Sequence, residues 1–312
     1  MRLVAHCAVV ASRVMSESVA SSLSFASSPS LAIQPAAPNE GGLDALREFM
    51  ERHRRLFVLT GAGASTASGI PGYRDANGEW MRAQPIQLQA FLDSEHARRR
   101  YWARSMVGWP LLAGAQPNAA HRALARLGAA DRVARLVTQN VDGLHQCAGS
   151  TDVIELHGSI RQVACLNCGV EHPRDDIQDI LARENPGLAD AVAAPSADGD
   201  AHLEWDGLDA FRVPACPRCG GFLKPSVVFF GESVPRERVD AATHALEAAD
   251  AMLVVGSSLM VYSGYRFCLW ASRAGMPIAA LNIGRTRADS LLSLKVELPC
   301  GDALAALAGH FS

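Results

Sequence analysis

Four of the eight cysteines in this 312-residue chain have the spacing of metal ligands. They form two C-x-x-C pairs, Cys165 with Cys168 and Cys216 with Cys219, and a glycine directly follows each pair. Four thiolates from two such pairs make a closed tetrahedral zinc site, which leaves no position for water. The spacing therefore predicts one structural zinc ion. The alternatives are two disulfides or two redox pairs, although a redox motif needs only one pair and nothing else indicates secretion.

A second segment that could do chemistry is the glycine-rich stretch TGAGASTASGIPGYRD at 60–75. It follows the apolar run LFVLT, which is typical of a strand buried on both faces. Gly61 and Gly63 have the G-x-G spacing of a turn that brings backbone amides close to phosphates. Thr66 stands where a dinucleotide-binding turn has its third glycine, and Pro71 comes where the following helix should continue. The stretch predicts a nucleotide site whose helix stops early.

Polar or small residues also follow other apolar runs that have the character of strands, at 135–140, 153–158, 251–258 and 277–284. In open parallel sheets, ligands bind beyond the carboxyl ends of the strands. The residues at these ends are therefore candidates for a functional site. They are Gln139, Asn140, Asp142, His157, Ser257, Ser258, Asn282 and Gly284.

The elements that must position these residues alternate between strand-like runs and alanine-rich helical segments, which favours a doubly wound α/β fold. We expect a Rossmann-like nucleotide-binding domain with a smaller zinc-binding module and a helical insertion. The expected ranges are 41–76, 111–160 and 224–312 for the Rossmann-like domain, 77–110 for the insertion and 161–223 for the zinc module. Residues 1–40, rich in serine and alanine, are expected to be a disordered N-terminal extension.

Composition narrows the classes of partner. The formal net charge is -3 and 49% of the residues are hydrophobic, which is ordinary for a soluble globular protein. There is no basic bias toward nucleic acid and no apolar run near the roughly 20 residues of a membrane span, so neither partner is expected. A cytoplasmic location is predicted. Because 1–40 has arginine and serine but few acidic residues, a mitochondrial transit peptide is the alternative.

Several further motifs accompany these two sites. GAGAS…SGIPGYRD, TQNVDGLH, ELHGS, the two C-x-x-C pairs, KPSVVFFGES, VVGSSL and LNIG occur in one order along the chain. In this order the chain resembles the sirtuins, the NAD-dependent protein deacylases, over about 44–300. YWARSMVGWP, VVGSSLMVYSGYRF and LNIGRTRAD are most similar to the class II branch, whose animal members are mitochondrial. The resemblance implies NAD as co-substrate, one structural zinc ion, and acyl-lysine proteins or peptides as substrates.

The resemblance also implies roles for individual residues. His157 would be the base that deprotonates a ribose hydroxyl, with Asn140 and Asp142 holding the ribose and the carboxamide. The phosphates would meet the amides of residues 62–65 at the start of a helix, and the segment around Pro71 would form a flap. The implied NAD contacts are Gly61, Ala62, Gly63, Ala64, Ser65, Pro71, Tyr73, Arg74, Asp75, Gln139, Asn140, Asp142, Gly256, Ser257, Ser258, Asn282, Ile283, Gly284 and Cys300.

On the substrate side, an extended peptide would add as a strand beside VVFFGES, with Val228 and Phe230 lining the acyl-lysine tunnel. Tyr101 and Arg104 are three residues apart in a predicted helix, so they share a face and could bind an acidic acyl group. A solvated arginine-rich helix is the simpler interpretation. Ser226 stands where the family usually has aspartate, which leaves any role of that carboxylate open.

The predicted reaction is lysine deacylation that consumes NAD and releases nicotinamide and O-acyl-ADP-ribose. Two alternatives lie within the family: mono-ADP-ribosyl transfer, and removal of longer or acidic acyl groups. A more distant one is an NAD-dependent oxidoreductase, which would lack the zinc pairs and would need an acidic residue at the end of its second strand. A zinc-ribbon interaction module is the non-enzyme alternative, but it leaves TQNVD and ELHG unexplained.

Overall fold

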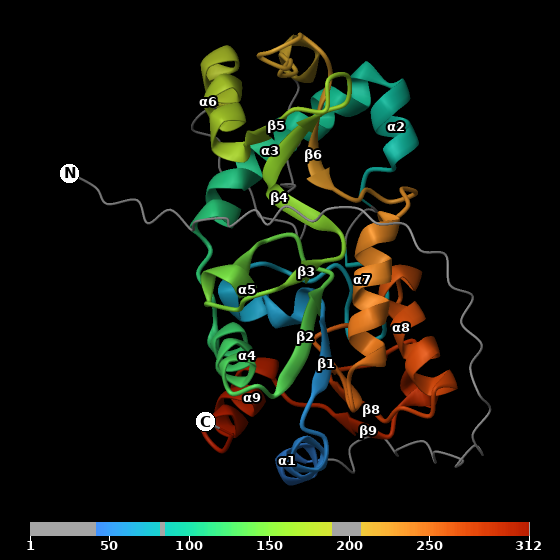
Figure 1. The fold of residues 1–312 in the computed structure, drawn as a ribbon. Coiled ribbons are helices and arrows are strands. Elements are labelled where there is room, and N and C mark those ends of the chain that lie inside the picture. Colours follow the sequence, from blue (N-terminus) through green and yellow to red (C-terminus); the bar gives the residue numbers. More distant parts are fainter. Residues whose placement is uncertain (1–41, 82–84, 189–206, 312) are drawn as a thin grey trace.

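The structure is a computed structural model that describes residues 42–81, 85–188 and 207–311 (Figure 1). The predicted N-terminal extension at 1–40 lies outside these residues. None of the helices in the described ranges is long and apolar enough to cross a membrane.

The main sheet has six parallel strands in the order β3-β2-β1-β7-β8-β9. Their bounds are β1 Leu56–Thr60, β2 Val133–Thr138, β3 Ile154–Glu155, β7 Ala251–Val255, β8 Ile278–Leu281 and β9 Leu294–Val296. Every residue of β1, β7 and β8 is buried, as expected for strands covered on both faces. The strand order reverses between β1 and β7, and ligands bind at such a reversal in doubly wound folds.

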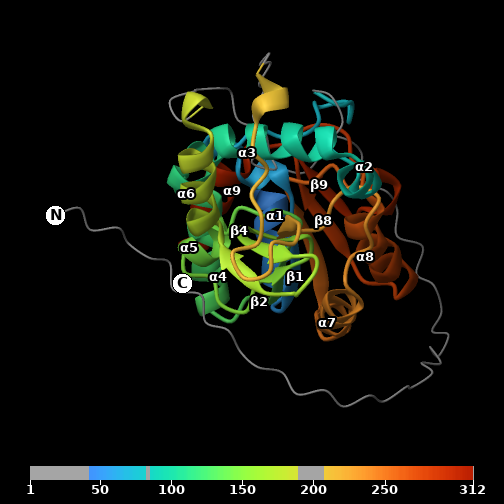
Figure 2. The same ribbon diagram turned by 90° about the horizontal axis from the view of Figure 1, so that it is seen from above.

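Helices cover both faces of this sheet. On one face, α1 (Leu43–Arg52), α4 (Ala119–Ala129) and α9 (Cys300–Ala308) share a core with inward residues such as Val58 and Leu253. On the other face, α7 (Arg236–Glu247) and α8 (Tyr262–Arg273) pack on strand residues that alternate with these, among them Phe57 and Val254. Figure 2 shows α7 and α8 on the opposite side of the molecule from α4. The prediction of a doubly wound α/β fold is confirmed.

A smaller unit lies above the main sheet in Figure 1. It contains α2 (Leu88–Asp93), α3 (Glu95–Gly114), α6 (Arg174–Glu184) and an antiparallel sheet in the order β5-β4-β6. The bounds of its strands are Gly158–Cys165 for β4, Glu171–Pro173 for β5 and Leu223–Val227 for β6. Side chains of α3, α6 and this sheet share one hydrophobic core. The predicted helical insertion and zinc module therefore pack together as one body.

Three of the expected boundaries fall inside regular elements, at 110 in α3, at 160 in β4 and at 223 in β6. Pro110 shows why the first is wrong. Proline lacks an N–H and leaves the carbonyl four residues earlier without its helical donor. That carbonyl, of Met106, accepts a hydrogen bond from Nε2 of Gln178 in α6 at 2.9 Å. The helix therefore continues to Gly114, because a neighbouring helix supplies the missing donor.

Candidate active site

A cavity of about 1220 Å³ lies at the carboxyl ends of the central strands. It lies at the reversal of strand order between β1 and β7, and the segment after β6 and the side chain of Tyr101 in α3 form part of its wall. All of the predicted NAD and substrate residues line it except Gly284 and Arg104. Residues from distant parts of the chain thus meet at one site, at the position that parallel-sheet topology favours.

The glycine-rich loop after β1 contacts the loop after β7 backbone to backbone. The Gly63 N–H donates to the Gly256 carbonyl at 2.8 Å. Gly256 has a φ of 60°, and a Cβ there would lie 2.3 Å from the Ala64 nitrogen. Glycine is therefore required at this crossing for steric and conformational reasons.

The predicted helix after β1 starts at Ala62 and stops early, but it is a 3-10 helix and not an α-helix. The segment forms two three-residue 3-10 turns, Ala62–Ala64 and Thr66–Ser68, and the second ends at Gly69, whose φ is 84°. The amides of Gly63, Ala64 and Ser65 already donate to carbonyls within the protein. These amides are therefore committed to the fold of the loop, and turns this short carry little of a helix dipole.

Hydrogen bonds to the buried Ser65 hydroxyl fix Asn140 and Asp142, two candidate residues that follow β2. Ser65 Oγ donates to Asp142 Oδ2 at 2.7 Å, and Asn140 Nδ2 donates to Ser65 Oγ at 3.0 Å. The other Asp142 oxygen accepts from the Leu144 amide at 2.9 Å, at the start of α5 (Leu144–Cys147). Asp142 therefore starts a turn and also orients the side chain of Ser65 at the cavity.

Two buried histidines beneath this group were not predicted. His121 Nδ1 accepts from the Asn118 amide, so Nε2 carries the proton and faces Ser65 Oγ at 3.4 Å. His145 Nε2 lies 2.9 Å from Thr60 Oγ1. Burial lowers the pKa of His145 to about 3 and also lowers the pKa of His121. The chain has ten histidines, and no spacing rule marks these two; only the position of His145 inside TQNVDGLH was a signal.

Because burial lowers the pKa values of His145 and His121, we expect the folded protein to lose stability in acid. In the unfolded chain a histidine has its ordinary pKa of about 6.5. Below this pH the unfolded state therefore binds protons that the folded state does not bind, and this favours unfolding. Stability is complete above about pH 6.5 and is lost as the pH falls toward the folded value, about 3 for His145. We expect the free energy of unfolding to be about 2 kcal/mol lower at pH 5 than at pH 7 from His145 alone.

Urea unfolding at both pH values measures this difference. His145→Gln should reduce the dependence on pH even if it lowers stability throughout. An equal free energy at pH 5 and pH 7 in the wild type would contradict the neutral state of these side chains.

His157 follows β3 and is held from both sides. Its Nδ1 lies 2.8 Å from the Gln139 carbonyl, which can only accept, so Nδ1 carries the proton. Its Nε2 lies 2.7 Å from Ser263 Oγ. Burial lowers the pKa of His157 to about 4, against a smaller opposing effect of the Gln139 hydrogen bond. At neutral pH, Nε2 is therefore unprotonated and has a lone pair that can accept a proton, which is the state a general base requires.

The segment after β6 forms the wall beside His157. The Val228 amide donates to the His157 carbonyl at 2.8 Å, and the Leu88 amide donates to the Phe230 carbonyl at 2.9 Å. The Phe230 ring lies against Tyr73 and Trp80. Val228 and Phe230 face the cavity as predicted, and the backbone that carries them is anchored to both structural units.

Tyr101 and Arg104 do not meet at the cavity. Tyr101 lies at the wall, where it packs against Phe91, Trp102 and Phe229. Arg104 is absent from the described lining. The structure thus brings Tyr101 but not Arg104 to the cavity wall, and the anion pocket stays a prediction. Residues three apart differ by about 60° around a helix, which is enough for one to face the cavity wall and the other to miss it.

The predicted flap residues close their own turn. Asp75 Oδ1 accepts from the amides of Asn77 and Glu79, both at 2.9 Å. Arg74 Nη1 donates to the Gly78 carbonyl at 2.6 Å, and its guanidinium lies over the Trp80 ring at 3.9 Å. Both side chains border the cavity, but their hydrogen bonds stabilise the loop that carries them.

At the far end of the cavity, Ser257 Oγ accepts from Gln139 Nε2 at 2.8 Å. Ser258, Asn282, Ile283 and Cys300 complete this wall. Gly284 does not line the cavity: its amide donates to Glu297 Oε1 at 3.0 Å, and a Cβ there would lie 2.4 Å from the Ala76 carbonyl oxygen. The structure gives Gly284 a packing role, which is to let the flap loop approach, and its NAD contact stays a prediction.

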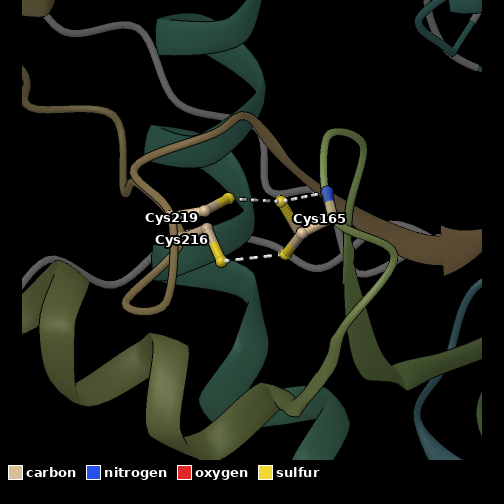
Figure 3. Close-up of side chains that lie close together, drawn as sticks. Cys165, Cys216 and Cys219 are labelled. Atoms are coloured by element: carbon tan, nitrogen blue, oxygen red, sulfur yellow. Dashed lines mark hydrogen bonds between the residues drawn. The ribbon is translucent and has the colours of Figure 1, made fainter.

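The four predicted metal ligands lie together, away from the cavity (Figure 3). Sγ of Cys165 is 3.5 Å from that of Cys219, Sγ of Cys168 is 3.9 Å from that of Cys216, and all four lie within 4.8 Å of one another. Tetrahedral zinc with Zn–S of about 2.3 Å needs sulfurs about 3.8 Å apart. The four sulfurs fit a zinc ion.

The two cysteine pairs share one turn geometry. Gly169 and Gly220 have φ values of 69° and 72°, and their amides donate to the carbonyls of Cys165 and Cys216. Left-handed backbone at both positions explains the glycine after each pair. Cys165 and Cys216 also belong to the core shared with α3 and α6, so the cluster is continuous with the packing of the smaller unit.

Comparison with known proteins gives the chain a family. A sequence model of the Sir2 family matches residues 61–263. An NAD-dependent protein deacetylase of Xanthomonas campestris pv. campestris (strain 8004) is 62% identical over 84% of this chain and 90% of its own length. One from Bordetella bronchiseptica is 59% identical over 84% and 96%.

Solved structures agree with this. A Sir2 protein with a p53 peptide and NAD+ has a TM-score of 0.67 at 27% identity, covering 86% of this chain and 98% of its own. A Sir2 homologue in complex with NAD has a TM-score of 0.65 at 28% identity, covering 86% and 93%. The class II assignment stays a prediction. With its doubly wound fold, its cavity at the strand reversal and its four-cysteine cluster, the chain belongs to the Sir2 family.

Proposed function

We propose that the protein is an NAD-dependent protein-lysine deacetylase that transfers the acyl group of its substrate to ADP-ribose. The observation that carries this proposal is His157. Its unprotonated Nε2 lies in the cavity wall between the glycine-rich loop and the Val228–Phe230 segment. The names of the curated relatives, at about 60% identity, support the same reaction.

NAD, when bound, supplies a ribose carbon that accepts the acyl oxygen as nicotinamide leaves. The side chains of Ser65, Asn140 and Asp142 are locked to one another beside the cavity and would orient that end of the co-substrate. His157 Nε2 would then accept a proton from a ribose hydroxyl, which is a task for a neutral imidazole. The four-cysteine cluster would hold zinc for stability and would take no part in the reaction.

The substrate would be a lysine-acylated protein or peptide. The 228–230 segment lines the cavity, and a peptide could pair with its remaining backbone groups as a strand. Main-chain hydrogen bonds of this kind give affinity with little dependence on sequence, so the acyl-lysine would be selected mainly by the tunnel around Val228 and Phe230.

The test is a mass-spectrometric assay of acyl-lysine peptides with NAD. Deacylated peptide together with free nicotinamide and acyl-ADP-ribose is the expected result. ADP-ribosylated protein without deacylated peptide would instead support mono-ADP-ribosyl transfer, which uses the same activated ribose. A rise in absorbance from NADH would support the oxidoreductase, and an absence of saturable NAD binding would support an interaction module.

The acyl preference gives a further prediction. Because Arg104 does not line the cavity, Arg104→Met should change kcat/KM for acetyl-lysine and for succinyl-lysine peptides by the same small factor, about two-fold at most. Parallel assays of the two peptides measure this. A loss of about 1.5–3 kcal/mol confined to the acidic peptide would support the anion pocket, because this is the contribution of a hydrogen bond to a charged group.

A further inference from the structure

Ser263 is a buried polar residue whose place in the site was not predicted from sequence. It is the second residue of α8 and has 8% of its surface exposed. A serine at this end of a helix often bonds the local backbone. Its hydroxyl instead lies 2.7 Å from His157 Nε2, across 106 residues of sequence, and Ser263 lines the cavity.

The direction of this hydrogen bond follows from the other side of the ring. The Gln139 carbonyl accepts a hydrogen bond from Nδ1, so the ring proton is on Nδ1. A neutral imidazole then has only an acceptor at Nε2, so the Ser263 hydroxyl must donate. Nε2 has one lone pair, so the Ser263 O–H must rotate away before another hydroxyl can pass a proton to this nitrogen; the serine oxygen can then accept a hydrogen bond from the protonated Nε2.

Close packing against Gln139 fixes the first turn of α8, and with it the contact between Ser263 and His157. A Cβ on Gly264 would lie 2.4 Å from Gln139 Oε1, so the helix packs directly against the residue that holds the opposite ring nitrogen. The Gln139 side chain is itself fixed by its hydrogen bond to Ser257. His157 is therefore held between the end of β2 and the start of α8, which lie far apart in the sequence.

Two guanidinium groups face the same imidazole, Arg238 from α7 and Arg266 from α8, and both disfavour its protonation. Neither is a hydrogen-bond partner of the ring, whose partners among the described residues are the Gln139 carbonyl and Ser263 Oγ. The charges thus influence the proton affinity of His157, whereas its orientation depends on Gln139 and Ser263.

We propose that Ser263 is a positioning residue for the general base: it directs Nε2 of His157 toward the cavity by donating to it, and it accepts from it after proton transfer. This inference rests on the proposed function. No bond is made or broken at Ser263; the proton that leaves the ribose hydroxyl stays on His157 Nε2 until it is released to solvent.

The test compares Ser263→Ala with the wild type in two assays. Deacylation should fall about ten-fold, the effect of one lost hydrogen bond of about 1.4 kcal/mol. Exchange of labelled nicotinamide into NAD, with acyl-peptide present, should change less than two-fold, because nicotinamide leaves before the base acts. Ser263→Thr keeps the hydroxyl and should recover most of the lost deacylation. Ser272→Ala, at the other end of α8 and outside the cavity lining, is the matched control.

A readout without NAD accompanies these assays. Nitrogen NMR of ring-labelled histidine, with His157→Ala for assignment, should show His157 protonated on Nδ1 in the free protein. In Ser263→Ala the Nε2 resonance should move toward that of a nitrogen with no donor. Unchanged deacylation and an unchanged resonance in Ser263→Ala would overturn the proposal, and so would an equal loss of exchange and deacylation. A wild type that exchanges nothing and deacylates nothing would instead refute the proposed function.

Discussion

Replacing His157 with alanine should lower NAD-dependent deacylation by at least a hundred-fold, the lower end of what a positioned general base contributes. The Kd for NAD should stay within a few-fold. His157 offers one nitrogen to the cavity, whereas the walls on either side are built from the loops after β1, β2, β7 and β8. The variant should therefore bind its co-substrate and stall after nicotinamide has left.

Steady-state deacylation of an acetyl-lysine peptide and calorimetric titration with NAD measure the two quantities separately. His96→Ala is a suitable control, because His96 is exposed on α3 and does not line the cavity. It should behave as the wild type in both assays. Full activity in His157→Ala would remove this residue from the mechanism, and a large loss of NAD affinity would show that it binds the co-substrate instead.

Cys216→Ser should lose the bound zinc and much of the stability of the smaller unit together. Structural zinc sites have apparent binding free energies of about 10–16 kcal/mol in small domains, comparable with the whole stability of a protein. Cys216 is buried and packs in the core that joins α3, α6 and β4. We expect the midpoint of thermal unfolding to fall by about 10 °C or more, which corresponds to about 3 kcal/mol in a chain of this size.

Metal analysis of the purified protein and a thermal scan test this result. The wild type should contain one zinc per chain, and a chelator should reproduce the loss of stability. Cys147→Ser is the matched control, since Cys147 lies outside the four-cysteine cluster, and it should keep its zinc. A stable wild type without zinc, or a Cys216→Ser variant that keeps both metal and stability, would refute a structural zinc site.

The fold class could be predicted because the central strands have no polar face. LFVLT became β1, and the apolar runs at 251–258 and 277–284 became β7 and β8, each shorter than its run. The polar residues at the ends of these runs lie beyond the strands for the same reason. A parallel sheet covered on both sides buries every strand residue, so the first polar side chains come where the strand ends.

Elements whose form depends on distant neighbours were predicted less well. Pro110 signals a helix end, but α3 continues because Gln178 bonds the carbonyl that proline leaves without a donor. The run at 153–158 formed only the two-residue strand β3, since Gly158 already begins strand β4 of the antiparallel sheet. Both outcomes follow from contacts between segments far apart in the chain.

The sequence alone determined the residue types of the site and the metal. Four cysteines in two pairs, each followed by glycine, specify a closed thiolate site, because ligand spacing and left-handed turns are local properties. The tertiary structure decided which side chains reach the cavity. Tyr101 lies at its wall and Arg104 does not, and Gly284 supports the flap loop. His121, His145 and Ser263 join the site from helices, although no rule of spacing assigned them a place there. Such placements depend on how helices pack against the sheet, and packing is set by the whole core at once.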